Sequence, residues 1–290
     1  MTNTWFITGA SSGFGLAIAN EALARGDNVI ASSRKGTSLT SLGDKGALLL
    51  DLDVTSDDSS LSAAMQAGID RFGEITHFIN APGYLLEGPA EGTSAADAQD
   101  SFNVNVLAIM NLTRLQIGYL RPRRKGVIAN FGSIGSWYGG AAWSHYAAAK
   151  WAVSGFTEGV HEEMKDFGVK VTVIEPGYFR TGFLNAGGDN RKTVSNGLEA
   201  EYKGTAVESY RNLFNVADNH QPGDVLKGAK VIVDVLTGTG VGADKEFPIR
   251  IMLGTDAIAD IRGKMERTEK LIQEWEGVIV STDHDDVKQA

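Results

Sequence analysis

Three glycines directly after a short apolar run limit the folds that this chain can adopt. The run 5–7 is typical of a buried strand, and Gly9, Gly13 and Gly15 follow it. A helical pattern over residues 14–25 begins within the same turn. A strand, a glycine-rich turn and a helix in this order form the first half of a βαβ unit, and the N-terminus of such a helix binds phosphate groups well.

Short apolar runs and longer helical patterns alternate along most of the chain. Strands are expected at 5–7, 29–31, 47–50, 75–79, 127–131, 169–174 and 249–253. Helices are expected at 14–25, 58–72, 94–120, 144–167, 223–236 and 256–275. The strands are apolar on both faces, as buried parallel strands are. This order predicts an α/β fold with a doubly wound parallel sheet, the Rossmann fold.

The last third of the chain is less regular. Residues 182–219 are polar and lack a strong period, so we expect an inserted loop and helix that act as a lid. No repeat or linker divides the sequence, and residues 1–290 are expected to form one domain. Residues 280–290 end in an acidic stretch and are expected to form a disordered tail.

Composition excludes several classes of protein. A net charge of −9 argues against a nucleic-acid or anionic-membrane surface. The chain has no cysteine, which excludes disulfides, thiolate nucleophiles and cysteine-based metal sites. The N-terminus lacks the pattern of a signal peptide, and no apolar run approaches a membrane span. We therefore expect a cytoplasmic protein that acts on a small molecule, without a metal.

Tyr146 and Lys150 are four residues apart in an expected helix, so their side chains share a face. The ordinary tyrosine pKa is about 10, and a nearby ammonium group lowers it by favouring the phenolate. Such a tyrosine is a general acid or base. Ser133 follows an expected strand and can donate a hydrogen bond to a substrate oxygen. A surface Tyr–Lys pair without chemistry is the alternative.

The glycine turn adds a second functional feature to the set Ser133, Tyr146 and Lys150. Glycine lets the backbone approach a pyrophosphate, and Ser11 and Ser12 add hydrogen-bond donors. A turn without a ligand is the alternative for the glycines alone. Together, a dinucleotide site and a proton donor predict hydride transfer between a nicotinamide and a carbonyl or alcohol.

The end of the second expected strand indicates which nicotinamide cofactor is used. The residues 31–35 contain no Asp or Glu to bind a ribose 2′-hydroxyl, while Arg34 follows Ser33 directly. An arginine at this place favours a 2′-phosphate, and hence NADP(H). The alternative is that Arg34 and Lys35 are solvated loop charges.

The spacing T-G-x-x-x-G-x-G at residues 8–15 resembles the short-chain dehydrogenase/reductase family. Further matches, in chain order, are Asp53-Val54, Asn80-Ala81-Pro82-Gly83, Asn105, the set Ser133, Tyr146 and Lys150, and Pro176-Gly177 followed by Thr181. They cover residues from about 4 to 182, and more loosely the C-terminal helix and strand. Ala81 and Pro82 depart from the family's second Asn and Ala, and Pro82 lacks a backbone N–H.

The resemblance implies roles for particular residues. Lys150 would contact the nicotinamide ribose, and Asn105 would hold a water in a proton relay beside Ser133 and Tyr146. The implied cofactor-binding residues are Gly9, Ser11, Ser12, Phe14, Gly15, Ser33, Arg34, Asp53, Val54, Asn80, Tyr146, Lys150, Pro176, Gly177, Phe179 and Thr181. A homodimer or homotetramer that pairs the long helices 94–120 and 144–167 is also implied.

Aromatic residues gather near the catalytic positions in the sequence. They are Trp137, Tyr138, Trp143, Tyr178, Phe179 and Phe183. Substrate sites are mostly hydrophobic and aromatic, so a bulky lipophilic or aromatic ketone is the expected substrate. The basic run 121–125 is interpreted as a solvated loop, and the five histidines have no metal-binding spacing.

Two other classes of protein remain open from the sequence. One is a non-catalytic, NADP-binding regulatory protein on the same fold, although such proteins often lack the catalytic Tyr or Lys. The other is an epimerase or dehydratase, which shares the Tyr-x-x-x-Lys pair but resembles a longer group with a different glycine spacing.

Overall fold

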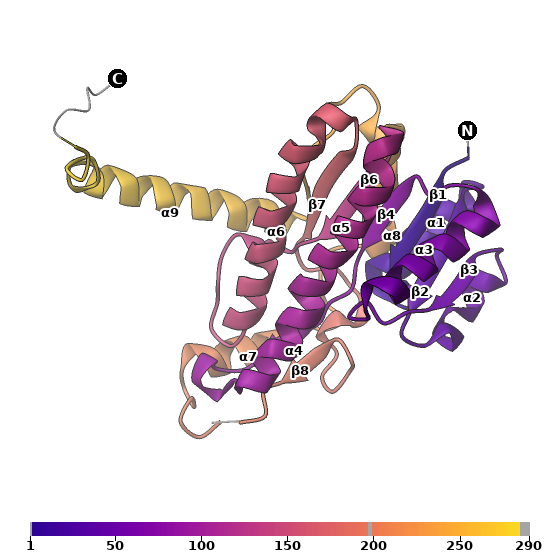
Figure 1. Cartoon of the computed structure of the whole chain (residues 1–290). Coiled ribbons are helices and arrows are strands. Elements are labelled where there is room, and N and C mark those ends of the chain that lie inside the picture. Colours follow the sequence, from indigo (N-terminus) through magenta and orange to yellow (C-terminus); the bar gives the residue numbers. More distant parts are fainter. Residues whose placement is uncertain (1, 197–198, 285–290) are drawn as a thin grey trace.

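A parallel sheet of seven strands runs through the centre of the computed structural model, which describes residues 2–196 and 199–284 (Figure 1). Its strands lie in the order β3-β2-β1-β4-β6-β7-β9. They are β1 (Thr4–Thr8), β2 (Asn28–Ser33), β3 (Leu48–Asp51), β4 (His77–Asn80), β6 (Val127–Phe131), β7 (Lys170–Pro176) and β9 (Arg250–Leu253). Every neighbouring pair is parallel. The predicted doubly wound α/β fold is therefore confirmed.

Helices cover both faces of this sheet. They are α1 (Gly13–Ala24), α2 (Thr40–Gly43), α3 (Asp58–Phe72), α4 (Ala95–Phe102), α5 (Ala108–Leu120), α6 (Ser144–Met164), α7 (Ala206–Ala217), α8 (Val225–Thr237) and α9 (Thr255–Val280). Buried side chains of α1 and α8 pack on one face of the sheet, and those of α3, α5 and α6 pack on the other. Side chains of β1 point alternately into the two cores, because Trp5 and Ile7 belong to one and Phe6 to the other.

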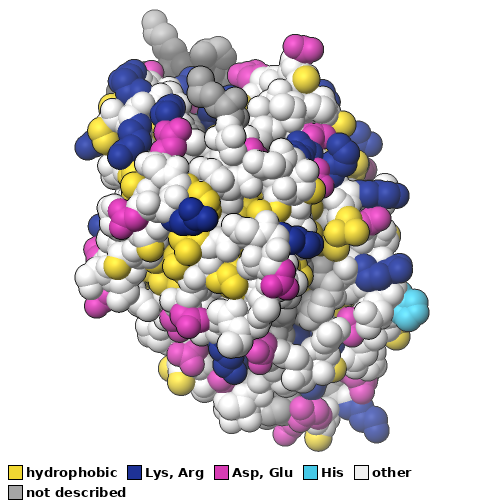
Figure 2. Space-filling view, turned by 90° about the vertical axis from the view of Figure 1, so that its right-hand side faces the viewer, with side chains coloured by type: hydrophobic (Ala, Val, Ile, Leu, Met, Phe, Trp, Pro, Cys, Tyr) yellow, Lys and Arg dark blue, Asp and Glu magenta, His cyan; other side chains and the backbone are white. Residues whose placement is uncertain are grey.

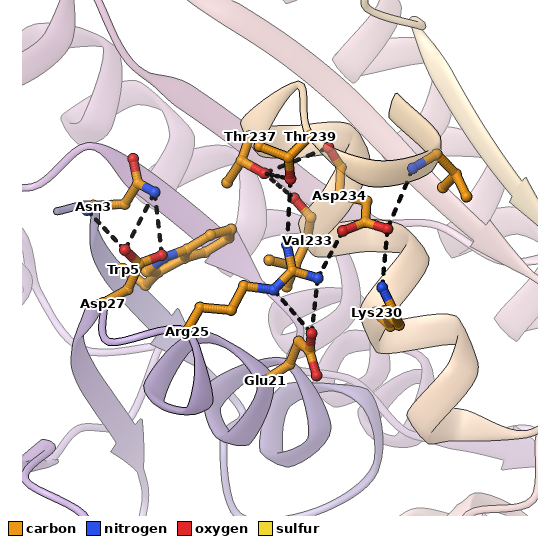
Figure 3. A network of polar contacts seen from close by, with 11 residues as sticks. Asn3, Trp5, Glu21, Arg25, Asp27, Lys230, Val233, Asp234, Thr237 and Thr239 are labelled. Atoms are coloured by element: carbon orange, nitrogen blue, oxygen red, sulfur yellow. Dashed lines mark hydrogen bonds and ion pairs between the residues drawn. The ribbon is translucent and has the colours of Figure 1, made fainter. Parts of the chain in front are cut away.

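A polar network fixes the first βα unit against α8 (Figure 3). The indole N–H of Trp5 donates to Asp27 Oδ2 at 2.9 Å, where α1 gives way to β2. At the end of α1, the Arg25 guanidinium lies 2.7 Å from Asp234 of α8 and 2.7 Å from Glu21. These contacts hold the glycine turn and its helix in a fixed place beside the sheet.

The expected helix 94–120 contains an irregular turn. It begins at a capping box formed by Ser94 and Asp97 and ends at Leu120, but residues Asn103–Leu107 form a π-helical turn between α4 and α5. The side chain of Asn105 in this turn bonds both the N–H and the carbonyl oxygen of Tyr84, each at 3.1 Å. Single π-helical turns inside longer helices are frequent at functional sites.

Residues 182–219 contain structure that the sequence did not predict. A short strand, β8 (Arg191–Thr193), pairs in parallel with β5 (Leu85–Glu87) to form a second, two-stranded sheet. Arg191 Nε lies 2.5 Å from the buried Glu87 carboxylate, and Arg211 of α7 lies 2.8 Å from its other oxygen. Strand β8 is polar and three residues long, so its pattern carries no period-2 signal. Residues 197–198 of this segment lie outside the described residues.

The C-terminal helix is longer than expected. Helix α9 runs from Thr255 to Val280, and it extends away from the rest of the molecule (Figure 1). The expected tail 280–290 therefore begins inside this helix, and residues 285–290 of it lie outside the described residues. Among the residues that the structure describes, none of the helices is long and apolar enough to cross a membrane.

Basic side chains in the loop 121–125 make local contacts. Arg123 and Arg124 each donate to a backbone carbonyl oxygen at 2.6 Å, and Lys125 lies 2.8 Å from Glu74. On the face shown in Figure 2, basic and acidic side chains are interspersed and apolar ones gather near the middle. The basic side chains of Arg123, Arg124 and Lys125 in this loop are thus bound by oxygen atoms of neighbouring residues.

Candidate active site

A cavity of about 340 Å³ lies at the carboxyl ends of the strands. Open α/β sheets bind their ligands at this edge. Most of the predicted site residues line the cavity: Gly9, Ser11, Ser12, Phe14, Gly15, Ser33, Arg34, Asp53, Val54, Ser133, Tyr146, Lys150, Pro176, Gly177, Phe179 and Thr181. The fold thus brings together residues from five separate turns of the chain.

The glycine turn has the geometry of a phosphate cradle. Gly9 has φ +70°, and a Cβ atom there would lie 2.7 Å from the carbonyl oxygen of Ala81. Ser12 begins α1 in an extended conformation, and its side chain makes no hydrogen bond to the helix. The first N–H groups of α1 are therefore left for another acceptor, and the helix dipole favours a negative one. The turn fits the pyrophosphate of a dinucleotide.

The end of β2 presents a cation to the same cavity. The side chain of Arg34 is 66 % exposed, and its nearest acidic partner is the almost fully exposed Asp189 at 3.9 Å. Ser33 is held by a 2.7 Å hydrogen bond that its hydroxyl donates to the carbonyl oxygen of Lys35. Asp53, after β3, accepts hydrogen bonds from the N–H and hydroxyl of Thr55, which lower the pKa of its carboxyl group.

The predicted catalytic residues meet at the cavity floor. Ser133 follows β6, and its Oγ accepts a hydrogen bond from Gly135 N–H at 3.0 Å. Tyr146 lies in the first turn of α6 and is buried. Lys150, one turn later, places its Nζ 5.8 Å from the centre of the Tyr146 ring. The predicted convergence of the three side chains on one cavity is what the structure shows.

Burial shifts the pKa of both titratable groups in this set. It raises the pKa of Tyr146 to about 12, and the Ser133 side chain opposes this shift only in part. It lowers the pKa of Lys150 to about 8. The sequence led us to expect a lowered tyrosine pKa, and this expectation was wrong. Burial makes the phenolate of Tyr146 costly to form, because the charge would be desolvated. The attraction of Lys150 does not compensate for this cost, because burial also disfavours the charged form of its amine.

Asn80 and Asn105 lie behind the cavity rather than on its wall. Both side chains are fully buried. The Asn80 amide is bonded to Gln116 of α5 and Asn130 of β6, and the Asn105 amide to the backbone of Tyr84. Their predicted roles at the cofactor and in the proton relay stay predictions.

A second buried network supports the catalytic helix. Glu175 of β7 is fully buried and accepts hydrogen bonds from Ser154 of α6 and Trp137, at 2.7 and 2.8 Å. Its charge is paired with Arg250 of β9. Ser136 donates to the carbonyl oxygen of Lys150 at 3.0 Å. Sequence reasoning missed this group, because a lone Glu in an apolar strand gives no motif.

Aromatic and apolar side chains form the part of the cavity wall beside Tyr146. Trp143, Phe183, Leu184 and Phe214 cluster there around Tyr146. The rings of Tyr146 and Phe183 are 5.8 Å apart. Of the aromatic residues singled out in the sequence, Trp143, Tyr178, Phe179 and Phe183 line the cavity. Trp137 and Tyr138 do not line it, and they pack against the start of α9.

One polar residue on this wall was not predicted. Gln221 is 2 % exposed, and neither the nitrogen nor the oxygen of its side-chain amide has a hydrogen-bond partner among the described residues. A buried, unpaired amide is costly, and natural proteins leave few such groups. Gln221 precedes Pro222-Gly223 in an irregular segment, where no pattern in the sequence marks it.

Comparison with known proteins agrees with this geometry. The short chain dehydrogenase family model matches residues 3–192. The oxidoreductase BOA17 of Botryotinia fuckeliana is 35 % identical over 263 residues, which cover 89 % of this chain and 91 % of that protein. A short-chain dehydrogenase from Streptomyces avermitilis is 32 % identical, with a TM-score of 0.85 over 98 % of this chain and 100 % of its own.

The chain therefore belongs to the short-chain dehydrogenase/reductase family. It is an oxidoreductase of a family that uses a nicotinamide cofactor. More distant structures share the fold, among them one from Burkholderia phymatum in complex with NAD, at 20 % identity and a TM-score of 0.76 over 100 % of this chain and 98 % of its own. Another, ElxO with NADP bound, is 22 % identical, with a TM-score of 0.70 over 89 % of this chain and 100 % of its own.

Proposed function

We propose that this oxidoreductase uses NADP(H) to interconvert a bulky lipophilic or aromatic ketone and its secondary alcohol. The observation that carries the proposal is that Ser133, Tyr146 and Lys150 line one cavity together with an aromatic wall that packs around Tyr146. An apolar wall desolvates a lipophilic substrate, and the polar set gives its carbonyl oxygen a place to bind.

Arg34 supports the choice of NADP(H). It is an exposed cation at the end of β2, on the cavity wall, and the acceptor nearest to it is a fully solvated carboxylate that can be displaced easily. An arginine in this position binds a 2′-phosphate by charge-assisted hydrogen bonds.

The chain's own groups account for the proton chemistry. When bound, the cofactor supplies or accepts the hydride. Because the pKa of Tyr146 is raised to about 12, its phenol is protonated at neutral pH and is ready to donate to the carbonyl oxygen. The Ser133 hydroxyl donates a second hydrogen bond to that oxygen and stabilises its developing charge. A protonated Tyr146 is the protonation state that the reduction step requires at its start.

Residues 182–219 are proposed as the lid of the site. Leu184, and Phe214 of α7, reach the cavity wall from this segment, and the Glu87 ion pairs tie it to β5. A closed lid excludes water from the hydride-transfer step.

A panel of aromatic and aliphatic ketones, assayed by NADPH absorbance, tests the proposal. We expect turnover with aromatic ketones and a preference for NADPH over NADH. Tyr146→Phe should abolish turnover while the thermal unfolding midpoint stays within a few degrees of the unsubstituted chain. Tyr119→Phe, on α5 and away from the cavity, is the control. Cofactor binding without turnover of any ketone would point instead to a regulatory protein.

A further inference from the structure

Helix α9 carries a line of mostly apolar side chains, and most of them are not covered by any of the described residues. The line follows a heptad spacing of alternating three and four residues. Its members, here called the α9 seam, are Ile258, Ile261, Met265, Thr268, Ile272, Trp275 and Ile279. Apolar residues repeated in this way over three heptads are typical of helices that pair with another helix.

Most of the seam is open to solvent. Ile261 is buried against the body of the protein, but the apolar residues from Met265 to Val280 are between 41 % and 58 % exposed. Figure 1 shows this part of α9 leaving the body. An exposed apolar stripe of this length is uncommon on a protein that acts alone, and it marks an interaction surface.

A groove at the base of α9 continues the seam. The α6–α9 groove has a volume of about 770 Å³ and is lined by Trp137, Trp151, Glu158, Met265, Thr268 and Ile272. The last three of these are seam residues, so the seam forms one wall of the groove. The other wall includes Trp151 of α6, which is 46 % exposed. An occupant that lies along the seam therefore also fills the groove.

We propose that the occupant is α9 of a second copy of this chain, lying antiparallel along the seam so that its residues 268–275 lie over the α6–α9 groove. Both helices of such a pair are α9, so both present the same heptad spacing of apolar residues to each other. In this register Met265 of each copy faces Trp275 of the other, and Thr268 faces Ile272. A two-fold axis then buries two seams and two grooves in one closed contact.

Space favours the antiparallel direction. In that direction Arg262, which flanks the base of the seam, lies next to Glu276 of the other copy on the outside of the apolar contact. The two copies of Glu269 lie near each other at the two-fold axis, so charge is compatible with this direction but does not select it. A parallel pair would place both protein bodies at the base of α9, where α6 already forms the wall of the groove.

Sedimentation of the full chain tests whether the seam pairs. Ile272→Lys puts a charge in the seam, and Gln273→Lys puts the same charge on the next, exposed position as a matched control. We expect Ile272→Lys to sediment as a smaller species than the unsubstituted chain and Gln273→Lys to sediment as the unsubstituted chain does. An unsubstituted chain that sediments as a monomer overturns the proposal, and the seam then belongs to another kind of partner. An unchanged size for Ile272→Lys also overturns it.

Cross-linking tests the direction of pairing. The chain has no cysteine, so Met265→Cys and Trp275→Cys each introduce a single thiol. These positions are about 15 Å apart along one helix, too far to be bridged within a chain. We expect a disulfide-linked dimer when the two variants are mixed and oxidised, and little from either alone. Linkage of Met265→Cys mainly to itself would show a parallel pair and overturn the proposal.

Discussion

The Nζ atom of Lys150 donates a hydrogen bond of 2.8 Å to the carbonyl oxygen of Phe131. This bond fixes the amine of α6 at the end of β6, close to Tyr146. Burial disfavours the charged form of each side chain, the phenolate of Tyr146 and the ammonium of Lys150. It therefore shifts their pKa values in opposite directions. Burial raises the pKa of Tyr146 to about 12 and lowers the pKa of Lys150 to about 8.

We expect the kcat/KM of ketone reduction to fall as the pH rises through about 8. The pKa of Lys150 is lowered to about 8, so its positive charge is present below this pH and is lost above it, while Tyr146 stays protonated throughout. Lys150→Arg keeps the charge at all accessible pH values and should remove the fall, at a lower rate. The check is a pH–rate profile of both proteins. A flat profile for the unsubstituted enzyme up to pH 10 would contradict the assignment.

Arg34→Ala should weaken the use of NADPH and leave NADH almost unaffected. A hydrogen bond to a charged group contributes roughly 1.5–3 kcal/mol, so we expect kcat/KM for NADPH to drop about tenfold to a hundredfold. Lys35→Ala is the matched control, since Lys35 is the next residue and does not line the cavity. Steady-state kinetics with both cofactors measure the effect. An equal loss with NADH and NADPH would show that Arg34 does not bind a 2′-phosphate.

Gln221→Leu should make the protein more stable and less active. The amide of Gln221 is buried without a partner, and removing such a group recovers about 1–3 kcal/mol. If the amide holds a polar group of the substrate, the KM of ketones that carry a second oxygen should rise. Urea unfolding and steady-state kinetics give the two readouts.

Gln116→Leu is the control for that substitution. Its amide is also buried, but both of its atoms are bonded to Asn80, at 2.8 and 2.9 Å. We therefore expect Gln116→Leu to lose stability. A Gln221→Leu variant that is less stable and has an unchanged KM would assign Gln221 a structural role only.

The fold and the polar part of the site could be predicted because local patterns encode them. Seven apolar runs between helical patterns predict the seven strands of the sheet, and strand ends in a parallel sheet meet at one edge. Gly9 and Ser133 closely follow the ends of strands, and Tyr146 lies at the start of α6, the α-helix that comes after Ser133. Their positions in the sequence were therefore enough to predict that they line one cavity.

The other features of the fold and of the site depend on contacts between residues far apart in the sequence, and local patterns do not encode such contacts. Strand β8 forms because Arg191 meets Glu87, 104 residues earlier in the chain. The raised pKa of Tyr146 follows from burial by residues of the inserted segment, such as Phe183, and the spacing of Tyr146 and Lys150 contains no information about that burial. Gln221 and Phe214 reach the cavity from the segment where the pattern is weakest.

His77 should make the protein sensitive to mild acid. Its ring stacks on Trp5 with 4.3 Å between centroids, and burial lowers its pKa from 6.5 to about 4. A group with a lowered pKa in the folded state stabilises the fold above its unfolded pKa, and this contribution is lost as the pH falls from 6.5 towards 4. Between pH 7 and pH 5 the free energy of unfolding should fall by about 2 kcal/mol on account of His77 alone.

His77→Phe isolates this contribution. Phenylalanine keeps the stacked ring and removes the titration, so the loss between pH 7 and pH 5 should shrink by that amount. His145→Phe, on the partly exposed first turn of α6, is the matched control, because it replaces a histidine that is not buried in the core with the same residue, phenylalanine. Urea unfolding at the two pH values measures the difference. Equal losses in the unsubstituted chain and in His77→Phe would mean that the imidazole has the same pKa in the folded and the unfolded chain. That result would remove His77 as the source of the acid sensitivity.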